Sequence, residues 1–355
     1  MAVPKRVDFP LWKEAADTPR RRIPRQVSDP SHSHGNSLFV EQAQTASASS
    51  RDSALLERVA APATSDLPMP RLLIVFAHPD DEVLAMGARL ERLAASRLLT
   101  VTDGAPSDGA DARHHGFASL EDYRRARQNE LAAALAHAGV SLETVSFGTA
   151  FPPSPVADQT AALHLLALTH AIASAIKAFA PEAILTHPYE GGHPDHDACA
   201  FAVHTAVRLR SRPAGEEGQT SAETTFVPVI LETPSYHAGD NGSMQTGVFL
   251  GSSASTQTIG RDLSAQEQAN KQTRLACFRS QAETLAQFGT GRELFRVAPH
   301  YDFTKPPHAG QLFFEQFPWG MAGVQFRSLA AEAIQQLFPP PATRKQPKLE
   351  TDLPS

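Results

Sequence analysis

Cysteine is scarce in this sequence. The 355 residues include two cysteines, Cys199 and Cys277, which is too few for a disulfide framework in a chain of this length. We expect both to be buried free thiols, because free cysteine is among the most buried residue types. No window approaches about 18 uninterrupted apolar residues, so no membrane-spanning helix is predicted. The polar, proline-broken N-terminus lacks the apolar segment of a secretory signal, and the cytoplasm is the expected location.

An excess of positive charge is also missing. The formal net charge is -6 at pH 7, and no basic stripe runs along the chain. Binding to nucleic acid or to an anionic membrane is therefore not expected. No G-x-G-x-x-G follows the first predicted strand and no Walker sequence occurs, which argues against a nucleotide-binding function. The expected partner is a small molecule, and a homo-oligomer stays open.

Composition divides the chain into three parts. The first is rich in Ser, Ala, Pro, Arg and Gln and predicts an extended or partly disordered arm, with a helical turn or two near Leu55 to Val59. An apolar pattern then begins sharply at Arg71 and predicts one domain, and the end of the chain predicts a disordered tail. The predicted boundaries are 1–69 for the arm, 70–338 for the domain (core 70–210, additions 211–338) and 339–355 for the tail.

Apolar runs alternate with helical periodicity through the core. Continuous apolar runs are typical of strands buried on both faces of a parallel sheet. An alternation of strand and helix predicts an α/β fold, a Rossmann-like open, mostly parallel sheet with helices on both faces. The predicted strands are 71–77, 98–102, 144–147, 182–186 and 226–232, and the predicted helices are 82–96, 119–138, 158–179, 195–210 and 264–288.

Two dense polar clusters each follow a predicted strand directly. Ala77-His-Pro-Asp-Asp-Glu82 comes after the first strand, and His187-Pro-Tyr-Glu-Gly-Gly-His-Pro-Asp-His-Asp197 after the fourth. Ligands of open α/β sheets sit at the carboxyl ends of the strands, so these clusters should converge. A catalytic zinc needs three nitrogen or oxygen ligands and an open position, with a carboxylate beside it as base and a donor for the oxyanion. Both clusters together offer enough imidazoles and carboxylates for such a site.

These paired motifs resemble the PIG-L/LmbE-like family of zinc-dependent de-N-acetylases. The resemblance covers about residues 70–210 and includes Thr102-Asp-Gly104 and the R-x-x-E of Arg127 and Glu130. It implies removal of an acetyl group from an N-acetylated amino sugar or sugar conjugate by metal-activated water. It also implies Zn²⁺ as cofactor, with Fe²⁺ or Co²⁺ possible.

Site roles are carried over from the resemblance one residue at a time. It implies that His78, Asp81 and His196 hold the metal, while Asp80 serves as the general base and later as the acid that protonates the leaving amine. The implied oxyanion donor is His193.

Further roles concern the second motif and the substrate pocket. The resemblance implies that Asp195 is hydrogen-bonded to His193 and sets its tautomer. It implies that Arg127 lies in the substrate pocket, the alternative being a helix salt bridge to Glu130. Asp103 is either a partner of a metal-bound histidine or the start of a turn.

One departure from the family pattern concerns a tyrosine. Some sugar deacetylases of the family carry tyrosine two residues before the first histidine of the second motif, and here that position is Gly191. Tyr236 and His237 are candidates for its work, against the alternative of ordinary loop residues. The stretch 239–260 is a possible substrate lid. The aromatic residues Phe313, Phe314, Phe317 and Trp319 are predicted to pack a core edge rather than to stack on a sugar.

Two other functions remain open from the sequence. The same site could serve a metal-dependent esterase or phosphoesterase, although ligands are apparent for one metal rather than for the pair that favours phosphoryl chemistry. A non-catalytic sugar- or nucleotide-binding Rossmann-like module is the third reading.

Overall fold

The computed structural model describes residues 50–140, 145–146, 156–211, 226–251 and 256–339. The chain divides into two compact units, residues 1–51 and 52–355, and everything below concerns the second. Its described residues contain a mixed seven-stranded sheet in the order β3-β2-β1-β4-β5-β9-β8 and a separate two-stranded hairpin. The strands are β1 Leu72–Phe76, β2 Arg97–Thr100, β3 Val145–Ser146, β4 Ala183–Thr186, β5 Val229–Glu232, β8 Thr258–Asp262 and β9 Arg292–Val297, with β6 Tyr236–Ala238 and β7 Met244–Thr246 in the hairpin.

The sheet is mostly parallel, as predicted. Strands β3, β2, β1, β4 and β5 pair in parallel, whereas β9 runs antiparallel to β5 and β8 antiparallel to β9. All five predicted strands are present, although Thr144 and Phe147 of the third lie outside the described residues. Strands β8 and β9 were not predicted, because β9 buries Glu293 and Arg296 where an apolar pattern would reveal a strand.

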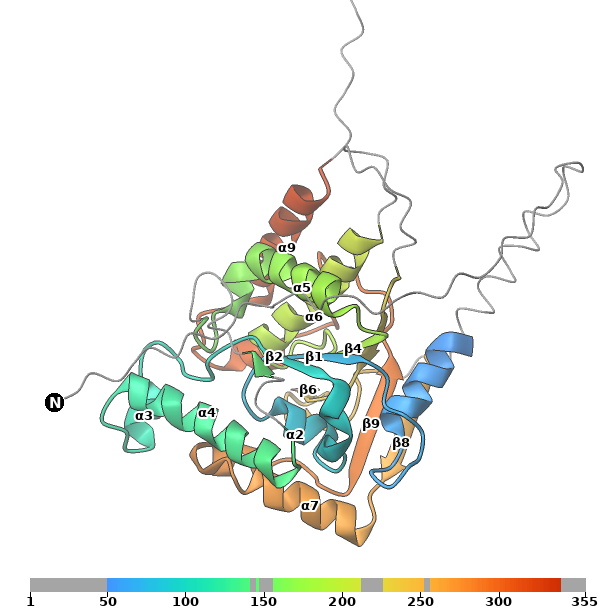
Figure 1. Ribbon diagram of the computed structural model, residues 1–355. Coiled ribbons are helices and arrows are strands. Elements are labelled where there is room, and N and C mark those ends of the chain that lie inside the picture. Colours follow the sequence, from blue (N-terminus) through green and yellow to red (C-terminus); the bar gives the residue numbers. More distant parts are fainter. Residues whose placement is uncertain (1–49, 141–144, 147–155, 212–225, 252–255, 340–355) are drawn as a thin grey trace, which may run out of the picture. The chain divides into compact units, whose positions relative to one another are not determined.

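Helices cover both faces of the sheet (Figure 1). On one face α5, α6 and α9 pack over one hydrophobic cluster, and on the other α2 and α4 pack over a second. Helix α7 lies against α2 and α4. The bounds are α2 Asp81–Met86, α3 Ala110–His114, α4 Leu120–His137, α5 Leu165–Phe179, α6 Pro194–Arg210, α7 Ala265–Leu275, α8 Ala282–Leu285 and α9 Gly323–Leu337.

Three predicted helices are shorter than expected. The helix predicted over 82–96 breaks after Met86 and continues as a 3₁₀ helix at Leu90–Ala95, because the side chain of Glu293 captures the backbone N–H of Ala88. The helix predicted over 264–288 ends at Leu275, where the chain turns and buries Phe278 in the core. Of the helix predicted over 158–179, only 165–179 is α-helical. Its predecessor at Ala161–His164 is a 3₁₀ turn.

A capping box marks the start of α7. Ser264 Oγ accepts from the backbone N–H of Glu267, and the Glu267 carboxylate accepts from the backbone N–H of Ser264. Two orphan N–H groups at the helix start are thereby satisfied, which fixes where the helix begins.

Packed structure begins before residue 70. A helix that ends at residue 60 buries Leu55, Leu56 and Val59 in the same cluster as α2 and α4. Its final carbonyl groups are held by arginine: Arg89 Nη1 donates to the carbonyl oxygens of Ala60 and Ala61. Cations at the C-terminal end of a helix satisfy its free carbonyls and oppose its dipole. Residues 50–69 of the predicted arm (1–69) therefore belong to the packed structure, whereas residues 1–49 lie outside the described residues.

A buried ion cluster joins distant parts of the domain. The carboxylate of Glu293 on β9 contacts Arg89 Nε at 2.6 Å and Lys271 Nζ at 3.2 Å, and all three side chains are buried. Arg89 follows α2, and Lys271 lies on α7. The cluster thus ties the antiparallel edge of the sheet to two helices on one face.

Among the described residues, one helix has the length and hydropathy that could cross a membrane. It spans Ala161–Phe179, with a mean hydropathy of 1.4. Its apolar side chains pack against α6 within the core, and its solvent side carries His170, Ser174 and Lys177. A buried core helix can have the same length and apolar composition as a membrane-spanning helix.

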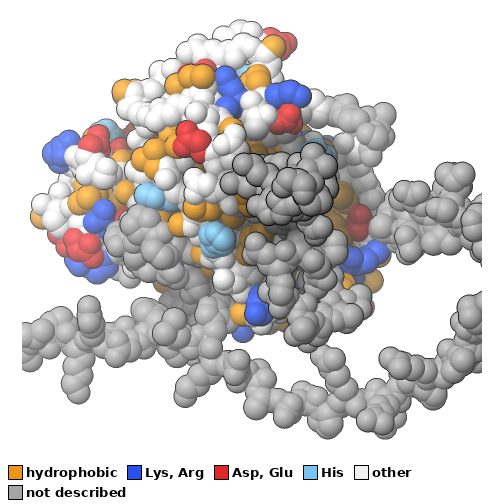
Figure 2. Space-filling model, turned by 90° about the horizontal axis from the view of Figure 1, so that it is seen from above, with side chains coloured by type: hydrophobic (Ala, Val, Ile, Leu, Met, Phe, Trp, Pro, Cys, Tyr) orange, Lys and Arg blue, Asp and Glu red, His pale blue; other side chains and the backbone are white. Residues whose placement is uncertain are grey.

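Charge and thiol placement agree in part with expectation. On the face seen in Figure 2, acidic and basic side chains are interspersed and neither sign forms a continuous patch. Both cysteines are free; Cys199 is buried, but Cys277 is only half-buried. Its sulfur lies at the C-terminal end of α7 and contacts the carbonyl oxygen of Thr273.

Candidate active site

The two polar motifs meet because their strands are neighbours. Strands β1 and β4 pair in parallel, with Val75 opposite Thr186, so the loops that follow them leave the same edge of the sheet. The first loop leads into α2, which begins at Asp81, and the second into α6, which begins at Pro194. His193 is the N-cap of α6. The predicted convergence at the carboxyl ends of the strands is therefore what the fold contains.

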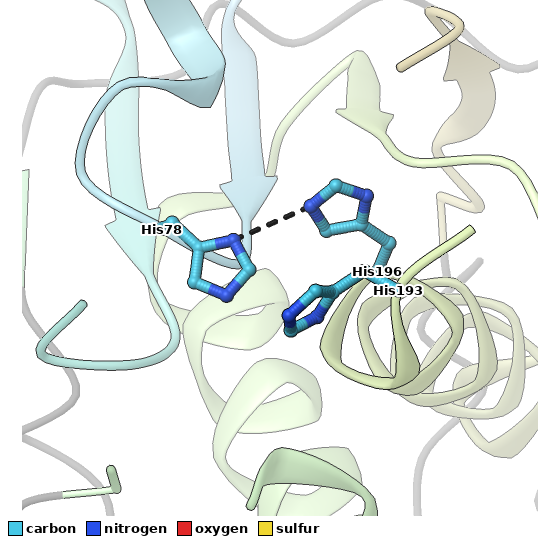
Figure 3. Close-up of side chains that lie close together, drawn as sticks. All are labelled: His78, His193 and His196. Atoms are coloured by element: carbon cyan, nitrogen blue, oxygen red, sulfur yellow. Dashed lines mark hydrogen bonds between the residues drawn. The ribbon is translucent and has the colours of Figure 1, made fainter. Parts of the chain in front are cut away.

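Three candidate metal ligands lie within contact of one another. His196 Nε2 lies 3.3 Å from His78 Nδ1 and 3.5 Å from Asp81 Oδ1, and His78 Nδ1 lies 3.4 Å from Asp81 Oδ2. Figure 3 shows His78 facing His193 and His196, which project from the start of α6. Ligands about 2.0–2.1 Å from a tetrahedral zinc ion lie about 3.3–3.4 Å apart. The two imidazole nitrogens therefore have the spacing of two ligands of one such ion, and the Asp81 carboxylate lies beside them, with Oδ1 toward His196 and Oδ2 toward His78.

Hydrogen bonds occupy Asp81 Oδ2 and His78 Nε2 and leave the other polar atom of each side chain available for a metal. The His78 backbone N–H donates to Asp81 Oδ2 at 2.8 Å, so Oδ1 is the oxygen left for a cation. His78 Nε2 lies 3.0 Å from Asp158 Oδ1, which leaves Nδ1 facing His196. An imidazole whose second nitrogen is held by a carboxylate is the usual arrangement for a metal-bound histidine.

His187 is a rival that the geometry makes less suitable. Asp81, His187 and His196 also place ligand atoms within 4.8 Å of one another. However, His187 Nε2 accepts the backbone N–H of Ala77 at 3.1 Å, so its lone pair is engaged. Its Nδ1 pairs with the hydroxyl of Ser235. His187 instead stacks on His196, with ring centroids 3.9 Å apart, and supports the loop that carries the first motif.

Burial and neighbouring charges set the protonation of the ligands. Burial and the proximity of His187 hold the pKa of His196 well below its ordinary value, so its ring is neutral and offers a lone pair. Burial alone would raise the pKa of Asp81, but His196 and His187 hold it well below its ordinary value. Burial opposes the charge on His78, yet Asp158 raises its pKa well above the usual value. A cation at His78 Nδ1 would take the place of a proton.

Asp80 stands beside these ligands with a different environment. Burial raises its pKa to about 6, against the opposing effect of Arg127. Arg127 Nη2 donates to Asp80 Oδ2 at 2.9 Å, which fixes one carboxylate oxygen and leaves the other unengaged by Arg127. A carboxylate with a pKa near neutrality can both accept and return a proton.

Comparison with known proteins finds a family whose model covers both motifs. Residues 73–207 match the family described as PIG-L: GlcNAc-PI de-N-acetylase. The chain is similar to this family over that range, which is less than half of its length. Both motifs, and every residue assigned above to the candidate ligand set and to the candidate base, lie within the matched range.

Two curated relatives share one name, which is that of a sugar deacetylase. A 1D-myo-inositol 2-acetamido-2-deoxy-alpha-D-glucopyranoside deacetylase of Kribbella flavida is 29% identical over 178 residues, which cover 43% of this chain and 59% of the relative. The protein of that name from Mycobacteroides abscessus is 33% identical over 179 residues, covering 46% of this chain and 63% of the relative. The chain thus spans less than two thirds of the length of these relatives. Among solved structures, the zinc-inhibited form of teicoplanin deacetylase Orf2 covers 65% of this chain and 99% of its own, at 19% identity and a TM-score of 0.44.

Arg127 and Asp103, which the resemblance suggested for the substrate side of the site, make different contacts. Arg127 is buried against Asp80, and its Nη1 also approaches Glu130 Oε2 at 3.8 Å, so it pairs with the candidate base and with its helix neighbour. Asp103 starts a turn: its carboxylate accepts from the backbone N–H of Ala105 and from Arg124 Nε. No contact between Asp103 and a histidine of the site is present among the described residues.

Asp195 takes a position that differs from the prediction. Its carboxylate accepts from the backbone N–H groups of Gln159 and Ala161 and lies 3.4 Å from His78 Nε2. The bond to His193 is made by the Asp195 backbone N–H, which donates to Nδ1 at 3.1 Å, because His193 caps α6. His193 Nδ1 is therefore an acceptor, and Nε2 carries the hydrogen. Burial lowers the pKa of His193 to about 4, so the ring is a neutral donor.

Gly191 cannot be replaced by tyrosine in this backbone. Its φ is +69°, and a Cβ at this position would lie 2.8 Å from Leu312 Cδ2. The ring of Tyr236 instead lies against His196, with centroids 5.4 Å apart, and the adjacent Gly192 packs directly under Tyr236. His237 alternates to the other side of β6 and pairs through Nδ1 with the carbonyl oxygen of Ala238. Tyr236 is thus the member of the pair that the fold brings to the site.

Asp158 is a site residue that the motifs did not reveal. Its carboxylate lies 3.0 Å from His78 Nε2 and 3.7 Å from His193 Nε2. It belongs to the connection that follows β3, and the rule that chemistry follows strand ends could have pointed to it. It was missed because no recognisable spacing surrounds the V-A-D-Q sequence.

We expect Asp158→Asn to weaken metal binding by about 10- to 100-fold, because an outer-shell partner orients the ligand and raises its basicity. The measurement is a competition titration of purified protein with a zinc chelator. Asp108→Asn, which changes an exposed aspartate, is the matched control. Unchanged zinc affinity in Asp158→Asn would show that His78 does not depend on this carboxylate.

Proposed function

We propose that this protein is a metal-dependent N-deacetylase of an N-acetylated amino sugar or sugar conjugate. The observation that carries the proposal is the spacing of His78 Nδ1, Asp81 and His196 Nε2, 3.3–3.5 Å apart, beside a carboxylate whose pKa is about 6. The printed names of the relatives, which are deacetylases of an acetamido glucopyranoside, support this substrate class.

The donor set fits zinc. Two imidazole nitrogens and one carboxylate oxygen leave an open position on a tetrahedral ion, as catalytic zinc sites require, and iron or cobalt would accept the same donors. When bound, the ion would polarise the acyl oxygen and lower the pKa of a water molecule. Asp81 and His78 each have their second polar atom held by a hydrogen bond, and His196 is stacked on His187. The three side chains are therefore held in place before a metal binds.

The chemistry of the protein groups follows from their contacts. Asp80 accepts a proton from the attacking water as the carbon–oxygen bond forms, and Arg127 keeps its carboxylate oriented. The Nε2–H of His193 donates to the developing oxyanion. The proton held by Asp80 passes to the amide nitrogen as the carbon–nitrogen bond breaks. Acetate and a free amine are the products.

The alternatives differ from this proposal in what they require. Two-metal phosphoryl transfer needs ions about 3.5–4 Å apart, each with its own ligands. Each of the three possible ligand groups among the described residues contains His78 or His196, so none of them is independent of these two histidines. A binding module without chemistry would have no need of Asp80 in its buried, raised-pKa environment.

Metal content and acetate release together test the proposal. Purified protein should contain about one zinc or iron per chain, and His196→Ala should lose most of it. His170→Ala, an exposed histidine of α5, is the matched control and should keep the metal. The loaded protein should release acetate from N-acetylglucosamine or a conjugate of it. Protein that takes up no added zinc would refute the metal site, and a metal-loaded protein that cleaves esters but no acetamide would favour the esterase alternative.

A further inference from the structure

Six aromatic rings form a closed circuit of contacts that includes two histidines of the candidate active site. Neighbouring ring centroids are 4.6–5.5 Å apart all the way round. We call this set the aromatic circuit. Its members in order are His193, His196, Tyr236, Phe313, Phe317 and Trp319.

The circuit is built on the second motif. The backbone N–H of Phe313 donates to the carbonyl oxygen of Gly191 at 2.9 Å, and Leu312 packs against the same glycine. The side chain of Gln316 donates to the carbonyl oxygen of Gly242 in the turn of the β6–β7 hairpin. The segment that carries Phe313 and Trp319 is therefore held against the loop that supplies His193 and His196.

The circuit is partly open to solvent. Phe313 is buried, as expected of a residue at a core edge, and so is its neighbour Phe314. Trp319 is half-buried with its ring tilted against that of His193, and Phe317 stacks on Trp319 with an interplanar angle of 16° and is 39% exposed. Partly exposed aromatic rings beside a buried cluster offer flat apolar faces to a ligand.

We propose that Trp319 and Phe317 form a stacking platform for the neutral sugar ring of the substrate. The inference rests on the proposed deacetylase function, because it takes His193 as the group that faces the acetamide. The ring of Trp319 is centred 4.7 Å from that of His193, so it is the neighbouring aromatic face available to a ring attached to the amide nitrogen. No member of the circuit is Lys or Arg, so its chemistry suits the apolar face of a neutral pyranose rather than a phosphate.

Kinetics with matched substrates test the platform. Trp319→Ala and Phe317→Ala should each raise KM for N-acetylglucosamine about tenfold, the effect of losing roughly 55 Å² of apolar contact, with kcat little changed. The same variants should leave kcat/KM for the ring-free N-acetylethanolamine within about twofold of the parent. Phe226→Ala, a 51% exposed phenylalanine outside the circuit, is the control. Trp319→Phe, which keeps a flat face, should restore most of the affinity.

Fluorescence provides a reading that does not need turnover. The chain has two tryptophans, Trp12 and Trp319, so Trp12→Phe leaves Trp319 as the single tryptophan. Adding N-acetylglucosamine to this variant should change its emission at saturating concentration, and Phe317→Ala should shift that saturation about tenfold higher.

The outcomes separate the two proposals. Acetate release with equal KM in Trp319→Ala, Phe317→Ala and parent would overturn the platform and leave the deacetylase standing. A sugar-dependent emission change in a protein that releases no acetate from any N-acetylated sugar would support the platform and overturn the deacetylase. Sugar binding detected by calorimetry without any change in Trp319 emission would overturn the platform.

Discussion

Replacing Asp80 by Asn is expected to reduce deacetylation about a thousandfold while leaving the metal in place. The carboxylate is the proposed proton acceptor, and the amide that replaces it cannot take a proton from water. Asn keeps the size of the side chain and can still accept from Arg127, which contacts Oδ2 at 2.9 Å. The three proposed ligands are not altered, so zinc content should match the parent.

The adjacent residue, Asp81, is the comparison for Asp80. Asp81→Asn changes a proposed ligand and should lose both metal and activity, whereas Asp80→Asn should lose activity alone. Elemental analysis and acetate release on the same preparations distinguish the two aspartates. An Asp80→Asn protein with parental turnover would disprove the assigned base, and one that had lost its metal would move Asp80 into the ligand set.

Replacing Glu293 by Ala is expected to lower the free energy of unfolding by about 3–5 kcal/mol. The substitution leaves Arg89 and Lys271 buried without their shared carboxylate and removes the acceptor of the Ala88 backbone N–H. Breaking a buried ion cluster by removing one partner costs more than the cluster itself contributes, because the remaining charges stay desolvated.

Urea unfolding measures this loss. Glu283→Ala, which removes an exposed carboxylate on α8, is the matched control and should change stability by less than about 0.5 kcal/mol. A triple variant with methionine at 89, 271 and 293 should recover much of the loss, because apolar side chains of similar size remove the uncompensated charge. Parental stability in Glu293→Ala would mean that water reaches the two cations.

The parallel core could be predicted because its physical signals are local. Strands buried on both faces need continuous apolar runs, and both β1 and β4 consist of such runs. The motifs follow these runs directly, so the topology rule predicts from the sequence alone that they lie together.

The antiparallel edge could not be predicted, because its buried positions carry charge. In β9 the inward residues include Glu293 and Arg296, each of which pairs with a residue far away in the sequence. Such pairing is a tertiary property, and the hydrophobic pattern that identifies a strand is lost. The breaks in the helices at Met86 and Leu275 have the same origin in contacts made by distant side chains.

The separate roles of the histidines in the second motif could not be predicted from the sequence either. His187, His193 and His196 look alike in sequence, and only the hydrogen bonds separate them: one accepts from Ala77, one caps a helix and one keeps its Nε2 toward His78. Asp195 likewise uses its backbone where its side chain was expected. Residue types identified the chemistry of the site, and backbone geometry decided which atom performs it.

The arginine contacts at the end of the first helix show that the chain needs more residues to fold than the range that holds the proposed ligands. Arg89 lies inside the range 73–207 that matches the family, yet it holds the carbonyl groups of Ala60 and Ala61, and its carboxylate partner Glu293 lies 86 residues beyond residue 207. A fragment trimmed to 73–207 would carry all of the proposed ligands but would lose α7 and α9 and leave a buried cation without either partner. For this chain, the matched residues contain the proposed ligands, and residues that stabilise their fold lie on both sides of the match.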